Sequence, residues 1–155
     1  MTNEELTNLK DDIITKSYRE LARMDIMIEF KELDDSLLDV GVLEDEGYYI
    51  EVDEELIKTT DENELFDVLT GGIAHELSHI CKKPRGAANV WLDKMLYKFS
   101  WQYRMMDERD TDLHVILRGY GKELLKFMQY SERLYSRYEE DGLSQIELKV
   151  LLEKK

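Results

Sequence analysis

Residues 71–80 read Gly71-Gly72-Ile73-Ala74-His75-Glu76-Leu77-Ser78-His79-Ile80 and contain His-Glu-x-x-His within a helical pattern. Two histidines four positions apart lie on one face of a helix, so both imidazoles can reach one tetrahedral metal ion. The glutamate between them, Glu76, can then act as a base toward water at that ion. This stretch predicts a zinc-binding helix with His75 and His79 as ligands. The alternative is a pair of surface histidines with an accidental glutamate.

The apolar residues around the motif distinguish these two interpretations. At about 100° per residue, the two histidines lie about 40° apart, and a stripe of apolar side chains lies about 120° to 180° from His75. The stripe consists of Phe66, Leu69, Ile73, Leu77 and Ile80. It indicates a core on one side and an organised histidine face on another. Gly71 and Gly72 each cost a helix about 1 kcal/mol relative to alanine, so they either allow close approach of a neighbour or mark where the helix restarts.

The composition limits the class of protein. The chain has 155 residues, 43% of them hydrophobic, which predicts a single globular domain over residues 1–155. A formal net charge of −14 argues against nucleic acid or an anionic membrane surface as the main partner. One cysteine, Cys81, rules out an intrachain disulfide, and its position on the helix makes a buried thiol a better prediction than a metal ligand. Without a signal-peptide pattern or a long apolar run, we expect a cytoplasmic protein.

The remaining patterns predict an α+β fold. Helical spacing is expected over residues 2–23, 61–82, 91–118, 122–138 and 144–155, and alternation predicts strands at 26–31, 38–43 and 48–52. The last two strands are expected to form a hairpin. This order describes a small, mostly antiparallel sheet packed on a long zinc-binding helix, followed by a helical C-terminal half.

A hydrolytic zinc site usually has three protein ligands and water, so a third ligand is needed. The candidates are the many acidic residues and His114. Glu108 and Asp112 are one helical turn apart, on a face separate from the apolar stripe of their helix. Glu108 could ligate the metal while Asp112 accepts the second N–H of a ligating imidazole. His114 points about 120° away from Glu108 and is more simply explained as a surface histidine.

These motifs together resemble those of the gluzincin metallopeptidases. His75 to His79, followed by Glu108-Arg109-Asp110-Thr111-Asp112, is similar to their His-Glu-x-x-His with a downstream Glu-x-x-x-Asp, and residues 48–79 resemble the approach to the active helix in CAAX-prenyl-endopeptidase-like heat-shock metallopeptidases. The short length makes the soluble minigluzincins, the abylysin and jannalysin type, the nearest resemblance. It covers about residues 26–125 and implies a zincin-like fold with Glu108 as third ligand and Asp112 behind His75.

The resemblance implies a zinc-dependent endopeptidase that acts on a peptide or protein substrate, with Glu76 as general base. An exposed edge strand around Tyr48, Tyr49 and Ile50 would pair with extended substrate, although an ordinary interior strand fits the pattern equally well. The family's oxyanion-stabilising residue is not identified, because no motif chooses among the downstream tyrosines, Tyr120, Tyr130, Tyr135 and Tyr138. Small members can be latent, with the cleft obstructed by their own chain. The segment from Gly142 to Lys155 could do this, or could dock on an ordinary groove.

Two other functions compete with this one. The regulatory peptidases of the ImmA/IrrE type also have His-Glu-x-x-His and a glutamate on a later helix, but act on a specific repressor. The Asp112 partner and the Arg118-Gly119-Tyr120-Gly121 stretch favour the minigluzincin interpretation. A non-catalytic or latent zinc-binding interaction module would carry the same ligands. An open coordination position at the metal would distinguish the enzyme.

Overall fold

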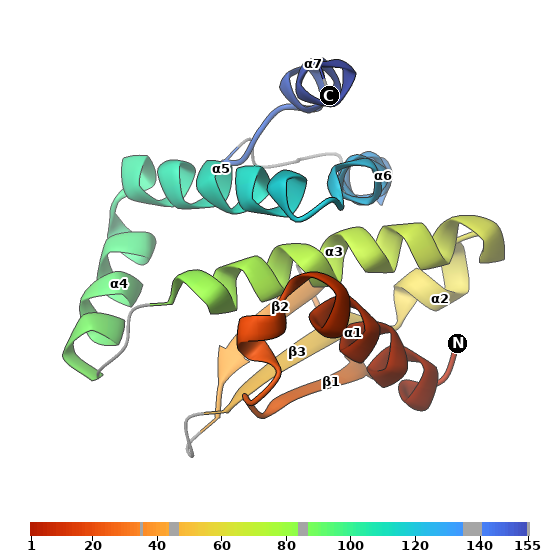
Figure 1. Ribbon diagram of the computed structural model, residues 1–155, viewed down its shortest axis with the longest axis horizontal. Helices are drawn as coiled ribbons and strands as arrows, with labels where there is room; N and C mark the ends of the chain where they lie inside the picture. The colour runs from red at the N-terminus through yellow and green to blue at the C-terminus, as the bar shows by residue number, and fades with distance from the viewer. Residues whose placement is uncertain (35, 44–46, 84–86, 135–140, 155) are drawn as a thin grey trace.

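A computed structural model describes residues 1–34, 36–43, 47–83, 87–134 and 141–154. It confirms the α+β class, with a helix, a small sheet and then helices along the chain (Figure 1). The elements in order are α1 (Asn3–Ser17), the 3-10 helix η1 (Arg19–Leu21), β1 (Ile26–Lys31), β2 (Leu38–Val42), β3 (Tyr48–Asp53), α2 (Glu55–Thr59), α3 (Glu62–Lys82), α4 (Ala87–Phe99), α5 (Trp101–Leu117), α6 (Gly121–Leu134) and α7 (Gln145–Glu153).

The sheet is mixed, with strand order β1-β3-β2. β2 and β3 pair antiparallel as the predicted hairpin, whereas β1 pairs with β3 in parallel. The expectation of a mostly antiparallel sheet is therefore wrong for one of the two pairings. β3, with Ile50 and Val52 completely buried, is the central strand and pairs with both of the others.

The prediction that the strand from Tyr48 to Val52 is an exposed edge is also wrong. Both sides of β3 are paired, so its backbone is not open to a substrate. Ile50 is completely buried, and Tyr49 lies across its cross-strand neighbour Gly41, where a Cβ atom would come within 2.0 Å of the ring. The interior-strand interpretation is the one that holds, and a substrate role for Tyr48, Tyr49 and Ile50 loses its structural basis.

Helix α3 lies at the centre of the molecule. The sheet and α1 are on one side of it, α5 and α6 are on the other, and α7 packs beyond them on α6 (Figure 1). Four members of the predicted apolar stripe, Leu69, Ile73, Leu77 and Ile80, are buried in the core. Phe66 is the exception, because its side chain is 53% exposed.

The two helix glycines serve close approach. A Cβ atom at Gly71 would lie 2.2 Å from the backbone oxygen of Glu123, so α6 approaches α3 closely at this point. At Gly72 a Cβ atom would lie 2.9 Å from Leu38 and 3.0 Å from Phe127. Helix α3 is continuous through both positions, which excludes a restart of the helix there.

Three helix predictions need correction. The first helix ends at Ser17 instead of about residue 23, and the helical pattern over 91–118 is two helices. The break falls at Ser100, which has extended backbone geometry and whose hydroxyl accepts the Tyr103 N–H at the start of α5. The short helix α2 was not expected. Residues 135–138, predicted to extend α6, lie outside the described residues.

Capping explains where α1, α3 and α7 begin. Thr2 and Ser144 each form a capping box with the glutamate three residues later, and Asp61 accepts the Asn63 N–H at the start of α3. None of the helices among the described residues has the length and apolar character needed to cross a membrane.

Candidate metal centre

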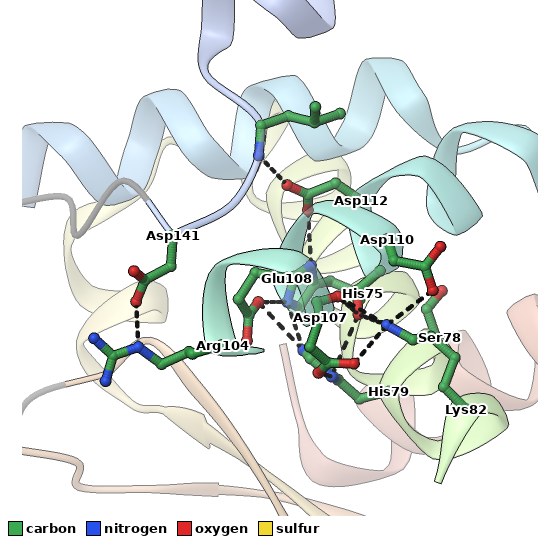
Figure 2. Close-up of polar contacts among 12 residues, drawn as sticks. His75, Ser78, His79, Lys82, Arg104, Asp107, Glu108, Asp110, Asp112 and Asp141 are labelled. Carbon is green, nitrogen blue, oxygen red and sulfur yellow. Dashed lines mark hydrogen bonds and ion pairs between the residues drawn. The ribbon is translucent and has the colours of Figure 1, made fainter. Parts of the chain in front are cut away.

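The predicted ligands come together from two helices. His75 and His79 are one turn apart on α3, and Glu108 faces them from α5 (Figure 2). Glu108 Oε2 lies 3.1 Å from His75 Nε2 and 3.4 Å from His79 Nε2, and the two Nε2 atoms are 3.1 Å apart. In a tetrahedral site with zinc–ligand bonds of about 2.0–2.1 Å, neighbouring donor atoms are about 3.3 Å apart. The spacing and chemistry of this donor set therefore fit zinc.

The Nδ1 atom of His75 is held by Asp112, as predicted. Its distance to Asp112 Oδ1 is 3.1 Å, and Asp112 is 2% exposed. A carboxylate oxygen accepts this hydrogen bond, so Nδ1 carries a proton, and Nε2 is the nitrogen that can offer a lone pair to a metal once the ring is neutral. This contact orients the ring for metal binding.

His79 has a different set of partners. Its Nδ1 atom lies 3.4 Å from Asp107 Oδ2 and 3.4 Å from Thr111 Oγ1. Lys82 Nζ is 2.8 Å from Asp107 Oδ1 and donates a 2.8 Å hydrogen bond to Thr111 Oγ1 (Figure 2). Both imidazoles are thus oriented by groups on α5, but the contacts to His79 are longer and are shared with a lysine.

The charges of the cluster are coupled. Burial alone would lower the pKa of His75, but hydrogen bonds to Asp112 and Glu108 outweigh it and hold that pKa well above its ordinary value. Burial likewise opposes a rise at His79, whose pKa is nevertheless raised by Asp107 and Glu108. Burial would raise the pKa of Glu108, yet the two imidazoles hold it far below its usual range. Without a metal, the site is an ion cluster of imidazolium and carboxylate groups.

Glu76 is buried beside these ligands. It is 8% exposed, and burial raises the pKa of its carboxyl group. The charges of Glu108 and Asp39 act in the same direction, whereas the two histidines oppose it. A desolvated glutamate with a raised pKa is a better proton acceptor near neutral pH than an exposed one.

The tyrosine that contacts the site was not predicted. The Tyr97 hydroxyl on α4 donates a hydrogen bond to Glu108 Oε1, the oxygen that faces away from the shortest imidazole contacts. Asp107, Thr111 and Lys82 were also missed. The sequence could have indicated these three residues. Asp107 directly precedes Glu108, Thr111 directly precedes Asp112, and Lys82 is one helical turn after His79.

Other candidates lie elsewhere. His114 is half-buried, packs edge-on against the Tyr18 ring and accepts a hydrogen bond from Arg118. It does not join the cluster of His75, His79 and Glu108. Cys81 is half-buried against Glu20, and burial raises the pKa of its thiol to about 12. Tyr120 stacks on Tyr18. Two further tyrosines considered for the oxyanion, Tyr135 and Tyr138, lie outside the described residues; Tyr130 forms a hydrogen bond with Thr59.

A comparison of the chain with known protein families, curated proteins and solved structures finds no match. The chemical interpretation of the site therefore depends on its own geometry.

Proposed function

We propose that the protein is a zinc-dependent endopeptidase of the gluzincin type. The observation that carries the proposal is the triangle of donor atoms from His75, His79 and Glu108, whose spacing fits one face of a tetrahedral zinc site. When bound, zinc supplies a Lewis acid that polarises a carbonyl group and makes water more acidic. The side chains of this chain supply orientation and proton transfer.

Glu76 is the general base in this proposal. It accepts a proton as a water oxygen attacks the carbonyl carbon, and it returns that proton to the amine as the C–N bond breaks. Two observations support the role: its burial beside both histidines, and the raised pKa that burial gives it. Glu76 contributes no donor atom to the His75, His79 and Glu108 cluster, so it is free for this task.

Strand β2 is the better candidate for holding extended substrate. The bonds of Asp53 N–H to Leu37 and of Leu43 N–H to Gly47 show that odd-numbered residues of β2 bond to β3. The N–H and C=O groups of Leu38, Val40 and Val42 consequently point away from β3, at an edge that can accept another strand. Two observations support a position of this edge near the site: the charge of Asp39 acts on Glu76, and a Cβ atom at Gly72, one turn before His75, would lie 2.9 Å from the Leu38 side chain.

The first experiment measures metal content and peptide cleavage together. The purified chain should hold about one zinc ion, as expected of a three-ligand site, and should cleave members of a mixed peptide library. The double variant His75→Ala, His79→Ala should lose the zinc. Full zinc content in that double variant would contradict the site assignment.

The second experiment separates an enzyme from a metal-binding module. Glu76→Gln should keep zinc and thermal stability but lose cleavage, while Glu62→Gln, an exposed glutamate in the first turn of the same helix, should keep both. A wild-type chain that holds zinc but cleaves no peptide, before or after limited proteolysis, would contradict the peptidase and leave the non-catalytic module. The proteolysis step includes a latent form in the test.

A further inference from the structure

The carboxylate of Asp112 connects the metal site to the end of the chain. One oxygen, Oδ1, lies 3.1 Å from His75 Nδ1. The other, Oδ2, accepts a buried hydrogen bond of 2.7 Å from the backbone N–H of Leu143. A single buried carboxylate thus bridges an imidazole on α3 and the backbone just before α7.

Further contacts hold this part of the chain on α5. Arg104 Nε lies 2.6 Å from Asp141 Oδ2 (Figure 2). Arg109 donates a hydrogen bond of 3.3 Å to the carbonyl of Gly142 and forms an ion pair of 2.7 Å with Glu147. Residues 141–154, which we name the C-terminal clamp, therefore dock on the helix that carries Glu108 and Asp112.

The clamp also has an apolar anchor. Leu143 and Leu148 are buried in the core, and Leu152 packs where a Cβ atom at Gly121 would come within 2.7 Å of it. A helix as short as α7 is marginal in isolation, so these contacts are what keep it ordered.

Gly142 lies in close contact with the side chain of Asp112. A Cβ atom at this position would lie 2.4 Å from Asp112 Oδ2. Among the glycines of the described segments, the positive φ that favours glycine occurs at Gly119 and not at Gly142. Residue 142 therefore needs to be glycine because of close approach, not because of its backbone conformation. The backbone of the clamp is therefore in direct contact with the carboxylate that orients His75.

We propose that the clamp is part of the metal centre, with Gly142 and the Leu143 N–H as positioning groups for Asp112, so that docking of the clamp and zinc binding strengthen each other. The inference rests on the proposed zinc site. Two donors, His75 Nδ1–H and Leu143 N–H, fix the plane of one carboxylate, and that plane fixes the tautomer and direction of the imidazole. Linkage requires the effect to be reciprocal: zinc must stabilise the docked clamp by the same factor.

This proposal predicts the opposite of autoinhibition by α7. Helix α7 packs on α6, on the side of α6 that faces away from α3 (Figure 1). Leu143, just before α7, supports Asp112 through its backbone N–H. Undocking the clamp should therefore weaken zinc binding instead of uncovering an active cleft.

Zinc affinity of full-length variants, measured by competition with a chelator, tests the proposal. Gly142→Ala should weaken zinc binding by about 10 to 100-fold, the usual effect of disturbing an outer-shell partner. Leu148→Ala should also weaken it, because it loosens docking without touching Asp112. Ile146→Ala, at a position of α7 that is 75% exposed, is the matched control and should bind as the wild type does.

A double-mutant cycle identifies the route of the effect. In an Asp112→Ala background the added Cβ at residue 142 no longer meets a carboxylate, so Gly142→Ala should cause little further loss of zinc affinity. An equal, additive loss in that background would overturn the proposed route through Asp112.

Hydrogen exchange of the wild-type chain supplies a readout that needs no substitution. The Leu143 amide proton should exchange more slowly when zinc is added, because the metal stabilises its acceptor through His75. If zinc leaves that rate unchanged and Gly142→Ala binds zinc normally, the clamp proposal is wrong while the peptidase proposal stands. A wild-type chain that binds no zinc would overturn both.

Discussion

The Tyr97 hydroxyl donates a hydrogen bond to Glu108 Oε1, while the other oxygen of that carboxylate, Oε2, faces both site histidines. Burial, together with the Glu108 charge, raises the pKa of Tyr97, so the hydroxyl remains a donor at any ordinary pH. A carboxylate with one oxygen engaged in this way offers a metal one donor instead of two. In the proposed zinc site, this contact would favour monodentate binding by Glu108 and would leave a coordination position for water.

Tyr97→Phe should lower zinc affinity by about 10-fold, without changing the stoichiometry, because the outer-shell hydrogen bond is lost while the ring remains. X-ray absorption at the zinc edge should show a higher mean coordination number as Glu108 becomes bidentate. Tyr103→Phe is a matched control, since its hydroxyl bonds to Asp93 across the same α4–α5 pair without touching Glu108. An equal loss in both variants would attribute the effect to helix packing.

Asp112→Asn should weaken zinc binding more than Asp107→Asn, by about 10 to 100-fold relative to the wild type. Asp112 accepts from both His75 Nδ1–H and Leu143 N–H, and an amide has only one acceptor oxygen to offer them. Asp107 is more exposed and lies farther from its imidazole, and Thr111 also contacts that ring. Chelator competition measures both variants. A larger loss for Asp107→Asn would show that His79 is the more dependent ligand.

The ion cluster predicts how the metal-free chain responds to pH. The pKa values of His75 and His79 are raised although burial opposes the rise. The stabilisation that the two imidazolium charges give to the folded state is therefore fully present below the ordinary pKa of 6.5. It is lost as pH rises through the raised pKa values. Glu108 has a lowered pKa despite burial, so its contribution is present above its ordinary value of 4.5 and is lost at lower pH. Both contributions are complete between pH 4.5 and 6.5.

The thermal midpoint of the metal-free chain should therefore fall as pH rises above 6.5. Zinc binds only the neutral imidazoles, so the increase in midpoint on adding zinc should be larger at about pH 8 than at about pH 6. Differential scanning calorimetry with and without chelator measures both. In the double variant His75→Gln, His79→Gln the zinc effect should vanish at every pH. A zinc effect that grows toward acid pH would contradict this prediction.

The residues that meet in the His75, His79 and Glu108 cluster could be predicted in part, because their spacing along each helix is a matter of local geometry. The spacing of His75 and His79, and of Glu108 and Asp112, places each pair on one face of its own helix, and the apolar stripes indicate which faces turn toward a core. Whether the two faces meet is a tertiary property that the spacing within each helix does not determine. The same reasoning cannot find Tyr97, whose contact with Glu108 depends on the turn of the chain at Ser100.

The sheet shows the same limit. Alternation identifies three strands, and the short connection predicts the β2–β3 hairpin. The sequence pattern does not say on which side of this hairpin β1 will lie, because the pairing of β1 with β3 depends on how α1 covers β1. Lys10 donates to the Ile26 carbonyl and Asn3 accepts the Phe30 N–H, so side chains of α1 occupy one edge of β1 and leave the other for β3. No residue within β1 or β3 encodes that arrangement by itself.

The two glycines of α3 provide a stability test that is independent of the metal. Alanine in a helix gains about 1 kcal/mol over glycine, but a Cβ atom at Gly71 would lie 2.2 Å from the Glu123 carbonyl oxygen, and backbone cannot move aside without separating α6 from α3. Overpacking of this kind costs about 1–3 kcal/mol or more, so Gly71→Ala should lower the free energy of unfolding.

At Gly72 the obstacles are the side chains of Leu38 and Phe127, at 2.9 and 3.0 Å, and these can shift. Gly72→Ala should therefore lie within about 1 kcal/mol of the wild type, because the gain in helix propensity offsets the repacking. Urea unfolding of the metal-free variants measures both free energies. If Gly71→Ala proved as stable as Gly72→Ala, the close backbone approach of α6 to α3 would not constrain this helix, and the glycine pair would need another explanation.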